Sequence, residues 1–306
     1  MRILILLVIY FFFSISPSFS WKSDEEKAKA FFKNNLEQSA DDYVSSRIEQ
    51  SLSKRFRNLE IDIADIDGGD TKFTIFSVQP LYDNPEAGRA TFFQGGIIVM
   101  DDADTLNLGL GQRWILNDGK VIAGLNLFYD NELDAGHERI SVGGEVLTSV
   151  GDFRINSYTA LSDRETIDGA DETALDGMDI ELALPLPYLP NTRIHAKSFS
   201  WEGHDGADDL EGSTTSLRSA LPFGLELEAG TTSYDDDAKE DADFVSLSFN
   251  IARFHQQKYV QQPVLVSDEA FALTEITDRR FEKVRRNRQV VKQSARTDFT
   301  VTFRGI

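Results

Sequence analysis

The chain has 306 residues and carries 31 Lys and Arg against 51 Asp and Glu, which gives a net charge of −20 at pH 7. This sign excludes nucleic acid as the partner, because binding to phosphates needs a basic surface. The absence of Cys excludes a disulfide scaffold and any thiolate site. With 41% hydrophobic residues and 8 Pro, the composition is that of a folded chain and not of a bundle of membrane-spanning helices.

Residues 1–20 have the organisation of a secretory signal peptide. A largely apolar run from Ile3 to Ile15 follows Arg2 and precedes the small residues Ser18 and Ser20. The run is short for a membrane-spanning helix, which needs about 20 residues, whereas it fits the apolar region of a signal. We therefore predict cleavage after Ser20; the alternative is an uncleaved anchor.

Residues 21–56 have a helical period. Apolar residues recur there every four positions, at Ala28, Phe32, Leu36, Ala40, Val44, Ile48, Leu52 and Phe56. This spacing predicts an amphipathic helix or helix pair. Because the segment follows the signal, we expect it in the periplasm, packed on the next domain or on a second copy as a homodimer. A simple spacer is the alternative.

After Phe56 the hydrophobic period changes to two. Apolar and acidic residues alternate over 59–63, and Gly68 and Gly69 supply a turn before the pattern resumes. The same signature recurs to about residue 251 and predicts twelve strands. We expect them at 58–65, 71–81, 89–100, 104–115, 120–130, 138–148, 152–162, 176–187, 191–202, 212–220, 223–234 and 242–252.

Each of these strands has an apolar and a polar face. In 105–114, Leu106, Leu108 and Leu110 share one face, and Asn107 and Arg113 share the other. A water-soluble sandwich would alternate in the same way. Length favours a membrane barrel, because strands of about ten residues match a tilted crossing of the hydrocarbon layer, whereas ordinary strands have about five or six.

The connections between the strands alternate in length. From the fourth onward, those after odd-numbered strands are longer and more acidic, such as 163–175 and 235–241, than those after even-numbered strands, such as 149–151. Membrane barrels have long external loops and short periplasmic turns. We therefore predict an all-β membrane protein, a twelve-stranded antiparallel transmembrane β-barrel over 57–253, in the outer membrane with its N-terminus periplasmic.

The last part of the chain has the opposite charge to the rest. From Asp278 to the end, nine Lys or Arg stand against three acids, so this tail is +6 and the remainder is −26. A solvated charge run is the common interpretation of such a segment. A basic tail on an acidic body also suggests that the two meet.

Short motifs recur in order along the predicted barrel and tail: Pro80-Leu81-Tyr82-Asp83, Phe92-Phe93-Gln94-Gly95-Gly96, Asp101-Asp102, Asp104-Thr105-Leu106-Asn107-Leu108-Gly109-Leu110-Gly111-Gln112-Arg113, Gly124-Leu125-Asn126-Leu127-Phe128-Tyr129-Asp130, His137-Glu138-Arg139, Gly143-Gly144-Glu145, Gly177-Met178-Asp179-Ile180, Leu189-Pro190 and Arg280-Phe281-Glu282-Lys283-Val284-Arg285-Arg286-Asn287. In this order and spacing they resemble the inverse autotransporter β-domain of intimin and invasin. The resemblance covers roughly residues 57–300.

The resemblance implies that a C-terminal linker, residues 254–306, threads the barrel lumen and leads adhesive, immunoglobulin-like passenger domains to the cell surface. An acidic lumen would suit a +6 segment, and polar groups inside a barrel need partners. The lumen-facing candidates are Arg113, Arg139, Glu145, Arg154, Asp179, Glu181, Lys197, Glu226 and Glu228. The basic linker residues are Arg279, Arg280, Lys283, Arg285, Arg286, Arg288 and Lys292.

Two departures from the family are expected. No peptidoglycan-binding module fits between the signal and the helical segment, and no passenger domain fits before Ile306. We therefore expect a translocator and anchor without a passenger on this chain. Its expected partners are outer-membrane lipid and lipopolysaccharide, the barrel assembly machinery and periplasmic chaperones.

Two other functions remain open. One is a plugged or diffusive pore, and the other is an omptin-like surface protease, for which His204-Asp205 and Asp101-Asp102 on external loops would be the candidates. The acid-rich stretches 163–176 and 235–237 lack the spacing of a calcium loop. We expect no catalytic residue, metal or cofactor.

Overall fold

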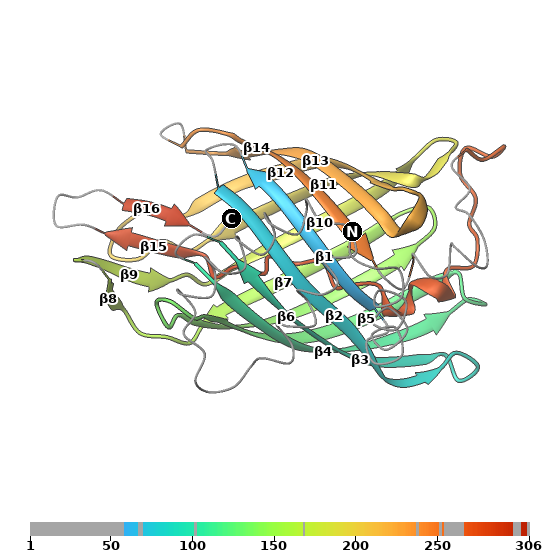
Figure 1. Ribbon diagram of the computed structural model, residues 1–306, viewed down its shortest axis with the longest axis horizontal. Helices are drawn as coiled ribbons and strands as arrows, with labels where there is room; N and C mark the ends of the chain where they lie inside the picture. The colour runs from blue at the N-terminus through green and yellow to red at the C-terminus, as the bar shows by residue number, and fades with distance from the viewer. Residues whose placement is uncertain are drawn as a thin grey trace, which may run out of the picture. The chain divides into compact units, whose positions relative to one another are not determined.

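The computed structural model describes residues 58–66, 70–100, 103–167, 169–236, 239–250, 253, 266–295 and 301–304. The predicted signal peptide and the helical segment 21–56 lie outside these residues. Twelve strands close into an antiparallel barrel (Figure 1), which confirms the predicted fold. They are β1 (Asn58–Ile66), β2 (Asp70–Asn84), β3 (Arg89–Val99), β4 (Thr105–Leu116), β5 (Val121–Glu132), β6 (Glu138–Thr148), β7 (Asp152–Ala160), β10 (Gly177–Leu186), β11 (Leu189–Trp201), β12 (Leu210–Ala220), β13 (Leu225–Tyr234) and β14 (Ala242–Asn250).

The barrel is closed by the first and last of these strands. Neighbours in sequence pair along the whole wall, and β1 pairs with β14, with Ile61 opposite Phe249. Closure leaves no strand edge unpaired, so the backbone groups of the wall are satisfied by one another. Within the described residues, no helix is long and apolar enough to cross a membrane.

The two faces of the wall differ in polarity, as the alternation predicts. Leu110 and Leu125 point outward and are 52% and 57% exposed, whereas Arg113 and Asp130 point inward and are fully buried. A water-soluble domain buries its leucines and exposes its charges. The inverse arrangement fits a barrel whose outer face contacts lipid and whose interior is polar.

One predicted loop contains regular structure. The stretch 163–175, predicted as a long acidic connection between two barrel strands, contains two short strands, β8 (Glu165–Ile167) and β9 (Ala170–Ala174). They join β15 (Lys292–Ala295) and β16 (Val301–Arg304) in a four-stranded sheet of order β16-β15-β9-β8. Acidic residues have low strand propensity. The pairing of β9 depends on a partner far away in sequence, so local patterning could not reveal it.

Most strand bounds differ from the predicted ones by one or two residues, and the largest difference is at the end of β2. Strand β2 continues to Asn84, beyond the predicted end at residue 81, after a register shift between Pro80 and Tyr82. Proline cannot donate to a ladder hydrogen bond and is found at bulges. The bulge lies at Pro80, where the alternation of apolar and polar residues is interrupted, and β2 continues to pair with β3 beyond it.

The two ends of the barrel are different. At the turn end, the connections are short and include residues 117–120 and the 3-10 turn η1 (Pro222–Gly224). At the loop end lie β8, β9, β15 and β16 (Figure 1). The C-terminal segment, red in Figure 1, enters at the turn end through the 3-10 helix η2 (Thr277–Phe281) and runs through the barrel to β15.

Candidate functional site

The candidate site is the linker, defined here as residues 277–295, together with the inward side chains that hold it. Before the linker enters, residues 266–276 cross three turns of the turn end. The amide of Ile276 donates to the carbonyl oxygen of Gly119 at 2.8 Å, and the hydroxyl of Ser149 donates to that of Ala272 at 2.7 Å. Ile276 is then buried with Ile122 and Leu147 of the wall. These contacts fix the place at which the chain enters.

Two arginines fasten η2 to the barrel. The guanidinium of Arg279 donates to the carboxylate of Asp152 at 2.7 Å, and Arg280 binds Asp83 at 2.8 Å. Arg279 also pairs with Glu282 of the linker itself at 2.6 Å. The Asp152 pair is enclosed, whereas about a quarter of the Arg280 and Asp83 side chains is exposed. Screening by solvent makes the Asp83 pair the weaker of the two.

The middle of the linker binds carboxylates on several strands of the wall. Arg285 bridges Glu181 of β10 and Glu228 of β13, at 3.1 and 3.0 Å. Lys283 binds Glu60 of β1. Buried ions are stable only when they are paired and hydrogen-bonded, so Arg285 holds the linker against the part of the wall from β10 to β13.

Asp130 of β5 is the partner of two arginines. Arg286 of the linker donates to its carboxylate at 2.8 Å, and Arg139 of β6 donates to the same group at 2.8 Å. All three side chains are fully buried. One carboxylate therefore compensates part of two buried positive charges.

Aromatic rings support the same segment. Phe281 and Val284 pack against Phe92 and Phe128, and the guanidinium of Arg286 lies 4.2 Å from the centroid of the Phe128 ring. Cations are attracted to ring faces at such distances. The wall makes room for the rings with glycines, because a Cβ on Gly109 would overlap the Phe128 ring and one on Gly111 would overlap Phe92.

The wall also binds the main chain of the linker. Arg113 donates from one nitrogen to the carbonyl oxygens of Arg280 and Glu282, at 3.0 and 2.7 Å. Arg139 donates to the carbonyl oxygen of Asn287 at 3.0 Å, and the amide of Asn287 donates to the Tyr158 hydroxyl at 2.7 Å. These bonds satisfy backbone groups that an extended chain inside a barrel cannot pair by itself.

At the loop end the linker becomes a strand. Lys292 lies between Glu132 of β5 and Glu172 of β9, at 2.5 and 2.7 Å, and the Leu175 amide donates to the carbonyl oxygen of Val291 at 2.9 Å. Val291 is fully buried in an apolar cluster with Tyr158, Leu175, Phe199, Trp201 and Leu210. At the loop end the linker is therefore held by apolar packing and by strand pairing.

A histidine lies beside this exit. The ring of His137, in the connection between β5 and β6, is fully buried, with its Nε2 atom 3.6 Å from a carboxylate oxygen of Glu172. Burial and the nearby positive charge of Lys292 lower the pKa of His137 below its ordinary value. His137 is therefore neutral at pH 7.

Comparison with known proteins agrees with this geometry. A scan against protein families matches residues 14–288 to the inverse autotransporter, β-domain. The chain belongs to this family. The resemblance drawn from the motifs is confirmed, and the inverse autotransporter β-domain described here is an outer-membrane β-barrel similar to those of intimin and invasin.

Each individual relative aligns with only part of this chain. The chain is 28% identical over 178 residues to the uncharacterized protein YchO of Escherichia coli (strain K12), covering 57% of this chain and 37% of that protein. It is 31% identical over 151 residues to invasin of Yersinia enterocolitica, covering 47% of this chain and 18% of invasin. The chain thus spans less than half the length of these relatives. A solved structure from work on in-meso crystallization of membrane proteins covers 78% of this chain and 99% of its own, with a TM-score of 0.63 and 18% identity, which supports the fold.

The structure places the predicted lumen-facing residues in three groups. One group contacts the linker directly: Arg113, Arg139, Arg154, Glu181, Glu226 and Glu228. A second orients neighbours, because Glu145 binds Arg113 at 2.7 Å and Asp179 accepts a hydrogen bond from Tyr158 at 2.5 Å. Lys197 stands apart, since it lines a cavity beside the linker.

Six barrel-side carboxylates that bind the linker or its exit strand were not among the predicted site residues: Glu60, Asp83, Asp130, Glu132, Asp152 and Glu172. For Asp130 a signal was present, because its position on β5 shares the face of Asn126. For Glu172 there was none, since β9 was not predicted. The inward rings of Phe92 and Phe128 were also not among the predicted site residues.

Two of the residues suggested for a surface protease form other contacts in the structure. Asp205 pairs with Arg164, and the amide of His204 donates to the side-chain oxygen of Gln293 in the linker at 2.9 Å. Asp101 and Asp102 lie outside the described residues. In the part of the chain that the structure describes, this loop holds the exiting linker.

Proposed function

We propose that this chain is a translocator and anchor of inverse-autotransporter type, whose barrel holds a linker that carries the polypeptide behind it to the cell surface. One observation carries the proposal. Within 279–292, six of the seven basic residues pair with carboxylates of the barrel or its loop-end sheet, and Arg288 is the exception among the described residues. A basic tail hanging in solvent would have no such set of fixed partners.

The proposal includes a direction. The turn end faces the periplasm, with the N-terminus, and the loop end faces outward, because short turns are periplasmic and longer loops external in bacterial barrels. The outward leucines contact outer-membrane lipid and lipopolysaccharide, and the barrel assembly machinery and periplasmic chaperones deliver the chain. Residues 21–56 pair two copies into a homodimer.

Surface labelling of intact cells tests the translocator role. A small folded domain with an epitope, fused after Ile306, should be labelled by antibody, as should a second epitope inserted after Asp208 at the loop end. An epitope after Asn117 at the turn end is the matched control and should stay unlabelled. If the loop epitope is labelled while the fused domain is not, the barrel is correctly inserted but does not carry the chain outward.

A plugged or diffusive pore is the second candidate. The observation that favours it is a cavity of about 210 Å³ beside the linker. A diffusive pore conducts ions with the linker in place, whereas a translocator held as described is closed. Conductance in planar bilayers therefore separates the two.

A further inference from the structure

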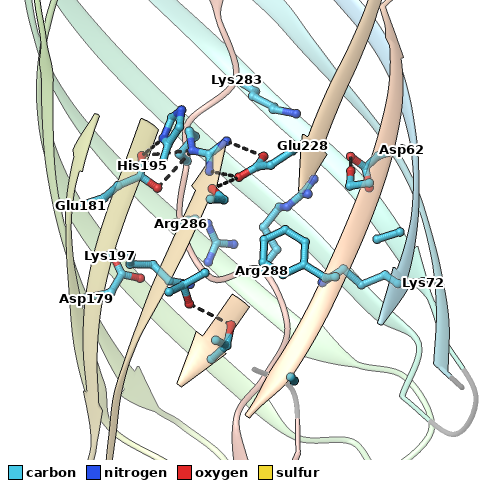
Figure 2. A pocket seen from close by; sticks show the side chains of 18 of the residues that line it. Asp62, Lys72, Asp179, Glu181, His195, Lys197, Glu228, Lys283, Arg286 and Arg288 are labelled. Atoms are coloured by element: carbon cyan, nitrogen blue, oxygen red, sulfur yellow. Dashed lines mark hydrogen bonds and ion pairs between the residues drawn. The ribbon is translucent and has the colours of Figure 1, made fainter. Parts of the chain in front are cut away.

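The linker does not fill the lumen. The cavity of about 210 Å³ lies between the linker and the inner face of β10–β14, β1 and β2, as Figure 2 shows. It has room for several water molecules or a small hydrated ion, since one water needs about 10–15 Å³. Four acidic side chains line it, against six basic ones: Lys72, Lys197, Lys283, Arg285, Arg286 and Arg288.

The four carboxylates are already engaged. Glu181 and Glu228 both bind Arg285, at 3.1 and 3.0 Å. Asp179 and Asp62 accept hydrogen bonds from side chains of the wall at distances of 2.5 to 2.8 Å. The donors to Asp179 and Asp62 are uncharged, so both carboxylates keep their negative charge, and Asp62 attracts Lys72 and Arg288. The six cations nevertheless outnumber the four carboxylates around the cavity.

Three of the cations have no carboxylate bound to them in the described part of the chain. Lys72 donates to the side-chain oxygen of Gln289 at 2.8 Å, and neither Lys197 nor Arg288 forms an ion pair there. The Nη1 atom of Arg288 is buried and has no hydrogen-bond acceptor. Its guanidinium lies 5.0 Å from the centroid of the Phe76 ring, a contact that satisfies none of its N–H groups.

The three cations line the same cavity. Figure 2 shows Lys72 and Arg288 on one side of the cavity and Lys197 across from them. Lys72 is near enough to both for their charges to repel its own. Like charges repel more strongly in a protein interior than in water, and a buried N–H without an acceptor is unfavourable. An anion in the cavity would offset the repulsion between these cations.

We propose that the cavity binds a small inorganic oxyanion of the phosphate class, held by Lys72, Lys197 and Arg288. A guanidinium offers paired N–H donors to such an ion, and two ammonium groups add charge. Asp62, hydrogen-bonded beside Lys72, opposes the anion and limits its affinity. Because the cavity lies inside the barrel, a headgroup attached to acyl chains cannot reach it, so the ligand is the free ion.

Calorimetric titration of the full chain tests the site. The protein is purified in detergent micelles without phosphate and titrated with inorganic phosphate at constant ionic strength. We expect saturable binding of one ion per chain. Lys197→Gln and Arg288→Gln should each weaken it at least about tenfold, which corresponds to the loss of one charge-assisted hydrogen bond. Asp62→Asn should instead tighten binding several-fold, because it removes the opposing charge.

Lys120→Gln, in a turn outside the cavity, is the matched control and should leave the affinity unchanged. Heat-dependent migration on gels checks that every variant is folded. The absence of saturable binding to the unmodified protein would overturn the proposal. So would a loss of affinity in Lys120→Gln equal to that in Lys197→Gln, because general surface charge would then explain the binding.

Discussion

Two walls of the barrel hold the linker in different ways. The wall formed by β4–β7 binds the main chain of the linker, through Arg113, Asn107, Arg139 and Tyr158, and it also pairs with two linker arginines, through Asp130 and Asp152. On the opposite wall, β13 binds linker side chains, since Glu228 pairs with Arg285 and Glu226 lies 3.9 Å from Lys283. The cavity lies along this second wall.

These two kinds of contact have different roles: one fixes the path of the linker, and the other recognises its sequence. Main-chain bonds form with a polypeptide of almost any sequence, so these bonds of β4–β7 can fix the path of a linker without choosing its residues. Ion pairs with β13 depend on where the linker has its basic residues, and they set its register. The first wall, which makes both kinds of contact, should therefore contribute most to holding the linker, whereas the contacts of β13 contribute mainly to selecting its sequence.

The largest expected effect is at Asp130 on the main-chain-binding wall. Asp130→Ala leaves Arg139 and Arg286 buried without their carboxylate, which should cost about 3–5 kcal/mol of unfolding free energy. Urea midpoints, followed by gel migration of unheated samples, measure this loss. Asp118→Asn, at an exposed turn position, is the matched control and should not shift the midpoint. A small shift in Asp130→Ala would mean that the buried arginines find other partners.

Replacing one arginine of the β4–β7 wall, and one linker arginine that binds β13, tests the comparison between the two walls directly. Arg113→Gln removes hydrogen bonds to the linker carbonyls and should cost about 2–3 kcal/mol. Arg285→Gln should cost less, because Glu181 keeps Arg154 at 2.9 Å and Glu228 keeps the Ser216 hydroxyl at 2.7 Å. Chymotrypsin cleavage of the linker at Phe281 in the folded protein reports both, because neither substitution changes that cleavage site. Faster cleavage in Arg285→Gln than in Arg113→Gln would reverse the roles of the walls.

Two glycine substitutions test how much the aromatic rings beside the linker contribute to stability. Gly109→Ala should displace the Phe128 ring, since an added Cβ overlaps it, and cost about 1–3 kcal/mol. Gly144→Ala is the matched control, because its Cβ would lie 3.7 Å or more from its neighbours. Urea midpoints of the two variants should differ in this order. Equal midpoints would show that the ring can move without cost.

The smallest effect concerns pH at the exit. Because the pKa of His137 is lowered by folding, its unfolded form takes up a proton first as the pH falls below about 6.5, its reference pKa. Stability is therefore full above that pH and decreases as the pH falls toward the folded pKa. Urea midpoints at pH 7.5 and 5.5 should differ more in the unmodified protein than in His137→Gln. A larger difference in the variant would assign the opposite sign.

Strand alternation was enough to predict the barrel, because lipid outside and polar groups inside impose one period on every strand. The change from a negative to a positive net charge after Asp278 likewise suggested that the linker pairs with the acidic barrel. Pairing across the chain was not predictable. That Glu172 lies opposite Lys292, or that Arg288 lacks a carboxylate, depends on which strands meet and where the linker is held, and no local pattern carries that information.

The most direct test of the threaded linker is ion conductance in planar bilayers. The full chain should be largely closed, and a chain ending at Phe254 should conduct with cation preference, because Glu181 and Glu228 lose Arg285 as their partner. Neutralising Arg285, Arg286 and Arg288 together should give intermittent openings. Heat-dependent gel migration confirms that each barrel is folded. Equal conductance in all three proteins would contradict a linker held inside the barrel.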